Sequence, residues 1–181
     1  MAFPIPKTIN LNDGQRAERK LLITVVEWEE EPAAAGGQPT KHREVLGRRT
    51  EDSSIEYNSD IATSTDILGI NYTDLNKTQP QQNFDPFLVM GGGRLAAVLV
   101  DVMNRNAISE LNQFTAYVID AFLGDATAGY EAVKHEECSI IPTAIGGDVN
   151  LNMPIELHFS NNLTTGTVDK LTDDFTFTAD A

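Results

Sequence analysis

Three glycines stand where a cofactor could bind, directly before a segment with helical periodicity. In the run Phe87–Ala96, FLVMGGGRLA, the spacing Gly91-x-Gly93-x-x-Ala96 is a loose form of the dinucleotide fingerprint, and Asp120 follows the next strand signal. That fingerprint works within a βαβ unit of a parallel sheet, and no second crossover helix is indicated after it. Glycines before a helix also serve as a flexible entry. A nucleotide-cofactor enzyme using the Gly91–Gly93 turn is therefore kept as the lesser alternative.

A second candidate is the pair His135-x-x-Cys138, two soft metal ligands with Glu136 and Glu137 between them. A structural zinc site needs four ligands, and the other two histidines stand alone in the sequence. Residues three apart on a strand also face opposite sides of the sheet. We therefore expect no metal site here, but an exposed His135 and a small buried thiol at Cys138.

No pattern for nucleophilic or acid–base catalysis is present. The sequence has no G-x-S-x-G motif, and Cys138, the single cysteine, lacks a recognisable triad context. Carboxylates are so frequent that no pair stands out. The sequence predicts a protein that is not an enzyme, with no catalytic residue, no cofactor and no metal.

The elements that would carry any such site are mostly strands. Strand patterns cover 21–29, where Trp28 is expected to be in the core, then 114–123, 130–145 and 155–159, with short signals at 55–57, 68–72 and 175–177. Residues 73–83 and 160–166 are predicted to be a connection and a turn. Strands before and after one helix predict a mainly β fold of two packed antiparallel sheets, a sandwich or barrel, flanked by one α-helix.

One convincing helix is predicted from about Gly93 to Asn106. At 100° per residue its apolar side chains share one broad arc, comprising Leu95, Val98, Leu99, Val102 and Met103. Arg94, Asp101 and Arg105 lie on the opposite side, and the last two have the i,i+4 spacing of an ion pair. The pattern predicts an amphipathic helix that covers a sheet and turns this polar face to solvent.

A breaker-rich stretch, 31–54, follows the first strand. It contains Pro32, Pro39 and three glycines but few large apolar residues, so it is predicted to be a long exposed loop or an extended hairpin. Basic residues gather in it, and we expect Arg43, Arg48 and Arg49 to make contacts between copies of the protein.

Size and charge limit the remaining possibilities. The chain has 181 residues, which fits one domain over 1–181, with 1–19 as an N-terminal arm. No stretch is apolar enough to span a bilayer, and no secretory signal is recognisable. Residues 51–181 hold five Lys or Arg against twenty Asp or Glu. Phosphate backbones would be repelled by this part of the chain, so specific nucleic-acid binding is not expected.

The segment Ile55–Phe87, IEYNSDIATSTDILGINYTDLNKTQPQQNFDPF, resembles the major tail tube proteins of long-tailed bacteriophages. The resemblance lies in its run of asparagines and aspartates, the Thr65–Gly69 segment, and the polar connection to Asp85-Pro86. It covers about a fifth of the chain; the rest is similar in layout only, and we expect no additional immunoglobulin-like domain after the last strand.

The resemblance implies a structural subunit that forms six-membered rings, which stack into the tube through which viral DNA passes without specific binding. The expected partners are further copies of the chain, a tape measure protein and a tail terminator. The expected location is the virion tail, after assembly in the bacterial cytoplasm. Another virion ring protein, such as a tail completion or connector protein, is the first alternative.

Overall fold

The computed structural model describes residues 9–32, 36–50 and 53–180 and has a mainly β fold with two antiparallel sheets and one α-helix. The strands are β1 (Leu22–Glu30), β2 (Thr40–Val45), β3 (Ile55–Glu56), β4 (Asp60–Thr65), β5 (Asn71–Lys77), β6 (Gln81–Phe84), β7 (Phe114–Asp125), β8 (Gly129–Pro142), β9 (Ile155–His158), β10 (Leu163–Val168) and β11 (Phe177–Ala179). The helix is α1 (Arg94–Arg105), and two short 3-10 helices are η1 (Arg19–Leu21) and η2 (Ile108–Asn112). The predicted fold class is confirmed.

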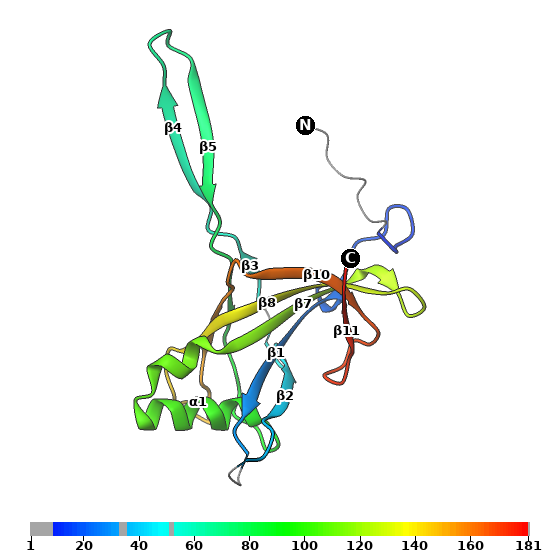
Figure 1. Cartoon of the computed structure of the whole chain (residues 1–181), viewed down its shortest axis with the longest axis vertical. Coiled ribbons are helices and arrows are strands. Elements are labelled where there is room, and N and C mark those ends of the chain that lie inside the picture. The colour runs from blue at the N-terminus through cyan, green and yellow to red at the C-terminus, as the bar shows by residue number, and fades with distance from the viewer. Residues whose placement is uncertain (1–8, 33–35, 51–52, 181) are drawn as a thin grey trace.

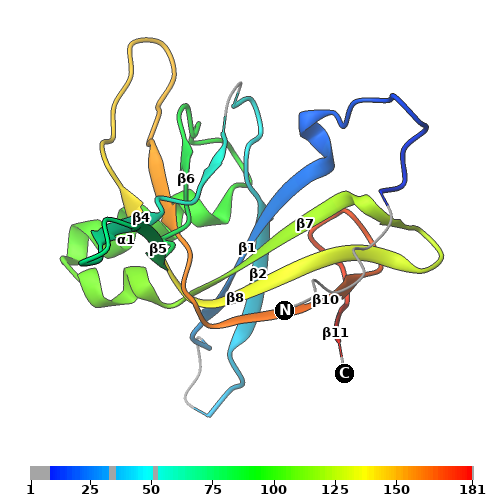
Figure 2. The same ribbon diagram turned by 90° about the horizontal axis from the view of Figure 1, so that it is seen from above.

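The body of the molecule is a nine-stranded sheet in the order β2-β1-β7-β8-β9-β6-β3, with β10 and β11 branching from β8 (Figures 1 and 2). The long strand β8 makes this possible, because Tyr130–His135 pairs with β10 while Ser139–Pro142 pairs with β9. Thr24 in β1 donates a hydrogen bond of 2.8 Å from its hydroxyl to the buried Gln82 in β6. Since β6 lies near the far end of the strand order, the sheet curls over its core like an incomplete barrel.

The helix lies where the sequence predicts it and covers the open side of this curl. Leu95, Ala96, Leu99 and Val102 are buried against β-strand residues such as Phe114 and Ile155. Each large side chain of this kind stabilises the fold by roughly 1.5–3 kcal/mol through burial. Met103, expected on the apolar arc, is 48% exposed instead. It lies at the edge of the arc and is only partly covered.

A second, smaller cluster lies on the other face of the sheet. Val25, Tyr117, Ile119, Ala132, Val168 and Phe175 form it, so β1 and β7 are covered on both faces at their centres. The segment after β10 folds back over the sheet to supply Phe175, whose ring meets that of Tyr117 edge-on at 4.9 Å between centroids.

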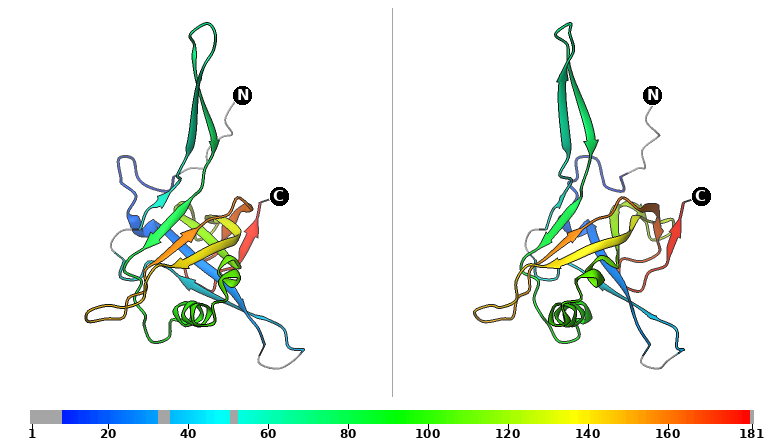
Figure 3. Two further views of the ribbon diagram at one scale, coloured as in Figure 1. Left: turned by 90° about the vertical axis from the view of Figure 1, so that its left-hand side faces the viewer. Right: turned by 60° about the vertical axis from the view of Figure 1, so that its left-hand side comes forward.

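The second sheet is the hairpin of β4 and β5, which projects from the body along the longest axis of the molecule (Figures 1 and 3). The strand predicted at 68–72 is correct only for its last two residues, which begin β5, since Asp66–Ile70 forms the turn of this hairpin. The connection predicted over 73–83 was wrong as well, because it contains β5 and β6. Both strands consist mostly of polar residues, so they lack the alternation of apolar and polar side chains by which a half-buried strand is predicted.

The stretch 31–54 contains β2, which pairs with β1 from Val25↔Val45 to Glu30↔Thr40, so the hairpin alternative holds for its centre. The predicted turn over 160–166 is shorter than expected, because β10 begins at Leu163. Phe175 precedes the last strand, which begins at Phe177. Of the predicted arm 1–19, residues 1–8 lie outside the described residues, and Asn10 donates its backbone N–H to Phe122 O at 2.8 Å.

Candidate assembly interface

The turn at the tip of the hairpin is organised by one carboxylate. Asp66 Oδ1 accepts the backbone N–H groups of Leu68 (2.8 Å) and Ile70 (2.9 Å), and Oδ2 accepts the hydroxyl of Tyr72 at 3.3 Å. The Ile70 and Leu68 amides and the Tyr72 hydroxyl hold the pKa of Asp66 below its usual value. Gly69 has a φ of 78°, which a glycine adopts without strain. The tip is thus a defined turn.

This turn presents large apolar side chains to solvent. Ile67 is 102% exposed and Leu68 79%, with Ile70 at 50% beside them. Along the strands, Ile61 (60%) and Leu75 (61%) form an equally exposed cross-strand pair. An isolated two-stranded ribbon is marginally stable in water, and contiguous exposed apolar groups mark interaction sites. The hairpin therefore has the properties of an element that docks on a partner.

An apolar groove of about 170 Å³ lies at the other end of the molecule. Its wall on the helix is formed by Val100, Met103 and Asn104, which follow one another at i, i+3 and i+4. The opposite wall is the segment 142–145 after β8, and Met153 forms part of the lining. Ile145, in this wall, is 56% exposed. No charged residue lines the groove.

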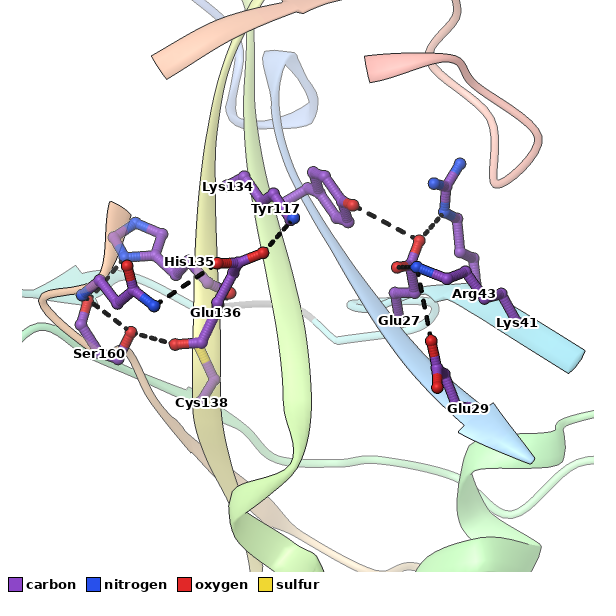
Figure 4. Close-up of polar contacts among 11 residues, drawn as sticks. Glu27, Glu29, Lys41, Arg43, Tyr117, Lys134, His135, Glu136, Cys138 and Ser160 are labelled. Atoms are coloured by element: carbon purple, nitrogen blue, oxygen red, sulfur yellow. Dashed lines mark hydrogen bonds and ion pairs between the residues drawn. The ribbon is translucent and has the colours of Figure 1, made fainter. Parts of the chain in front are cut away.

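The basic residue Arg43 lies within a polar network of its own chain (Figure 4). Its Nε donates to Glu27 Oε2 at 2.6 Å, and the Glu27 side chain is 5% exposed. Lys41 Nζ lies 3.2 Å from Glu27 Oε1, and the hydroxyl of Tyr117 donates to Oε2 at 3.4 Å. Burial, reinforced by the negative charge of Glu27, raises the pKa of Tyr117 to about 12.

Arg43 also fastens the segment before β11. Its Nη1 donates to the carbonyl of Phe175 at 2.5 Å, and the guanidinium lies 4.2 Å from the centroid of the Phe175 ring. Arg48 and Arg49 lie after β2 and are exposed. A contact of Arg43, Arg48 or Arg49 with another ring remains a prediction. For Arg43, the guanidinium would have to make that contact while it also binds Glu27.

The predicted polar face of α1 is exposed, and its residues bind different neighbours. Arg105 donates to Asp101 at 2.8 Å, as the i,i+4 spacing predicts, and makes two further hydrogen bonds to Glu110 in η2. Arg94, at the other end of α1, lies 3.0 Å from Nδ1 of His42 in β2 and 3.8 Å from Glu30 in β1. These contacts join the helix to η2 and to the β1–β2 hairpin.

The Gly91–Gly93 turn leads into α1, as expected, but the helix start is already occupied. The backbone N–H groups of Arg94 and Leu95 both donate to Oε2 of Glu44, each at 3.1 Å. A phosphate would need these amides, since the first N–H groups of a helix are the ones that bind anions. The strand pairs described are all antiparallel, so this turn does not belong to a βαβ unit.

His135 and Cys138 face the same side of β8, contrary to the sequence expectation. The pairing passes from Ala116↔His135 to Phe114↔Cys138, so one extra residue is present in β8, and Glu137 has a φ of 59° there. This bulge restores a common face for residues three apart. His135 is buried rather than exposed, packs on Phe159, and donates from Nδ1 to Ser160 O at 2.9 Å (Figure 4). Burial lowers the pKa of His135 and raises that of the Cys138 thiol.

Neither group is arranged as a metal centre. Within residues 9–32, 36–50 and 53–180, no group of three or more His, Cys, Asp or Glu side chains is placed to hold a metal ion. In the same part of the chain, no helix has both the length and the apolar character that crossing a membrane requires.

Sequence reasoning missed Asp66, Glu27 and Glu44. For Asp66 a signal was present, because Asp66-x-x-Gly69 has aspartate and glycine at the first and fourth positions of a β-turn. Glu27 and Glu44 gave no local signal, since their partners lie far away in the sequence.

Comparison with known proteins finds chains of similar fold among solved structures. A chain of the anti-feeding prophage baseplate, determined by cryo-electron microscopy with sixfold symmetrisation, is 11% identical; the match covers 94% of this chain and 100% of that one, with a TM-score of 0.46. A chain of the tube-terminating cap of the same prophage is 12% identical over 92% and 93% of the two chains, with a TM-score of 0.42. No family model and no curated protein matches. At these values the similarity says nothing about individual residues or their chemistry.

Proposed function

We propose that the protein is a non-enzymatic structural subunit of a phage-type tail, which assembles into hexameric rings that stack into the tail tube for DNA ejection. The observation that carries the proposal is the β4–β5 hairpin, which stands away from the body with Ile67 and Leu68 exposed at its tip. In the single chain the large apolar side chains of this element stay exposed, and in an assembly they would be buried against another copy.

The sequence resemblance falls on the same element. The segment 55–87, which resembles tail tube proteins, comprises β3 to β6 and so includes the whole projecting hairpin. The resemblance therefore lies in the part of the chain best suited to contacts outside its own body.

The edges of the nine-stranded sheet also favour assembly. Among the described residues, β2 pairs only with β1, and β11 pairs only with β10. An open edge is a template for pairing with another chain, and a closed ring of subunits would pair each edge with a neighbour. Since each chain carries a net charge of −14, such a ring would let DNA pass without binding it. Further copies, a tape measure protein and a tail terminator would be its partners in the virion.

The test is negative-stain electron microscopy of the purified chain at high concentration, with mass photometry of the same sample. We expect sixfold rings or hollow tubes. A variant in which residues 60–77 are replaced by a short glycine–serine turn should keep the fold of the body but form no tubes, because the contact between successive rings is lost. Polymerisation of that variant as efficient as that of the full chain would refute the role of the hairpin.

Copy number distinguishes the alternative of a completion or connector protein. A tube subunit is repeated along the whole tail, whereas a connector occupies one ring. Quantitative mass spectrometry of the intact particle should therefore find this chain among its most abundant proteins. An abundance equivalent to a single ring would instead support the completion or connector protein and refute the tube subunit.

A further inference from the structure

We infer that the hairpin tip of one copy, Ile67 and Leu68, docks into the apolar groove between α1 and residues 142–145 of a second copy displaced along the long axis of the molecule. This inference rests on the proposed function and names the two surfaces through which successive rings would contact each other.

The tip is prepared for docking before any contact forms. The hydrogen bonds of Asp66 to the Leu68 and Ile70 amides fix the turn from which the two side chains project. Binding through an ordered element loses less conformational entropy than binding through a flexible loop. Most of the free energy from burying Ile67 and Leu68 would therefore contribute to the affinity between copies, because little of it is offset by ordering the turn.

The groove has a suitable size and composition for one of these side chains. Its volume of about 170 Å³ is similar to that of apolar cavities of ~150 Å³ that accept benzene. Val100, Met103 and Ile145 give it apolar walls. A branched aliphatic side chain such as that of Leu68 would fill it.

The two surfaces lie in line with each other at opposite ends of the molecule. In Figure 1 the hairpin points to one end of the long axis, and α1 lies near the other end, beside the β1–β2 hairpin. In Figure 2, which looks along that axis, the hairpin lies over α1. A second copy shifted along the axis would therefore bring its α1 towards the tip of the first copy. This head-to-tail contact repeats without limit, as a stack of rings requires.

Charge favours this pair of surfaces over others. Two copies that each carry a net charge of −14 repel each other over most of their surface. The tip residues 67–70, Ile-Leu-Gly-Ile, carry no charge, and no charged residue lines the groove. The charge next to them is the carboxylate of Asp66, which accepts hydrogen bonds from Leu68, Ile70 and Tyr72 of its own hairpin. The two copies therefore bring few like charges together there.

Cysteine cross-linking tests the contact directly. In Leu68→Cys/Ala144→Cys, oxidation of the assembled protein should produce a ladder of linked copies on a non-reducing gel, because each copy joins two others. Mixing the two single variants should stop at dimers. The matched control is Leu68→Cys/Ala97→Cys, since Ala97 is exposed on the same helix but does not line the groove. It should give no ladder.

Introducing a charge on either surface tests the energetics of the contact. Leu68→Glu and Met103→Glu should each raise the concentration at which assembly begins by roughly 100-fold, because a buried apolar group is replaced by a charge. Thr63→Glu in β4 and Ala97→Glu in α1 are the matched controls, both at exposed positions, and should change it by less than about threefold.

The possible failures are distinguishable. Tubes that assemble without the Leu68–Ala144 cross-link, or that tolerate Leu68→Glu and Met103→Glu, would refute this docking and leave the proposed function standing. A wild-type chain that forms no rings or tubes at any concentration would refute the proposed function and this docking with it.

Discussion

Arg43 should stabilise the single chain more than any other basic residue of the stretch 31–54. The Arg43→Met substitution keeps much of the aliphatic stem and removes the charge. It leaves Glu27, whose side chain is 5% exposed, without the guanidinium that now lies 2.6 Å away. It also removes the hydrogen bond to the Phe175 carbonyl.

The size of the effect follows from these contacts. Removing one partner of a buried ion pair costs about 3–5 kcal/mol, and stacking of a cation on an aromatic ring adds ~0.5–1 kcal/mol. Two features reduce the cost, since Lys41 remains 3.2 Å from Glu27 and the Arg43 side chain is 23% exposed. We therefore expect Arg43→Met to lower the free energy of unfolding by about 2–3 kcal/mol, after allowing for solvent screening.

Urea unfolding followed by the fluorescence of Trp28, the single tryptophan, measures this loss. Trp28 is buried and adjacent to Glu27, so its signal reports on the same region. The midpoint should fall by roughly 1–1.5 M urea at an m-value of about 2 kcal/mol/M. The measurement requires a dilution at which the midpoint no longer depends on protein concentration.

Two controls make the reasoning refutable. Arg48→Met removes an exposed arginine near Arg43 and should change stability by less than about 0.5 kcal/mol. In the double variant Glu27→Gln/Arg43→Met the buried charge is gone, so the combined loss should be at least ~1 kcal/mol smaller than the sum of the single losses. Equal effects of Arg43→Met and Arg48→Met, or strict additivity with Glu27→Gln, would show that no buried ion pair stabilises the chain here.

Two further predictions concern the body of the fold. Leu99→Ala in α1 should lower the free energy of unfolding by about 2–5 kcal/mol, since Leu99 is 0% exposed, and circular dichroism during urea unfolding would show it; a loss below 1 kcal/mol would contradict the packing of the helix. Burial lowers the pKa of His135 from its ordinary 6.5, so the unfolded chain binds the proton more readily. Stability should be complete above pH 6.5 and fall as the pH drops below it. His135→Gln should flatten this dependence between pH 7 and pH 5, and an unchanged slope in that variant would exclude His135 as its cause.

The sequence alone identified the helix and most strands of the body. Residues 94–105 repeat apolar side chains with the helical period, and Gly93 and Asn106 bound the helix as its N- and C-caps. In 155–159 apolar and polar residues alternate, and Ile155, Leu157 and Phe159 are buried. These signals are local, because an element that buries one face must repeat its apolar residues with its own period.

The sequence also argued against a dinucleotide site at the Gly91–Gly93 turn, since no second crossover helix is indicated after it. It predicted contacts between copies in the basic stretch after the first strand, which stays a prediction. It gave no indication that the hairpin of β4 and β5 projects from the body.

Only the tertiary structure determined the partners of Glu27, Glu44 and His135. Arg43 lies 16 residues from Glu27, and Glu44 caps a helix that begins 50 residues later. One additional residue in β8 turned His135 inward. The partners of Glu27 and Glu44 depend on how the sheet curls, and the bulge depends on the register between β7 and β8. Both features are set by the packing of segments far apart in the sequence, so they produce no periodic pattern of apolar residues. A projecting hairpin is also invisible to periodicity, because it has no buried face in the single chain.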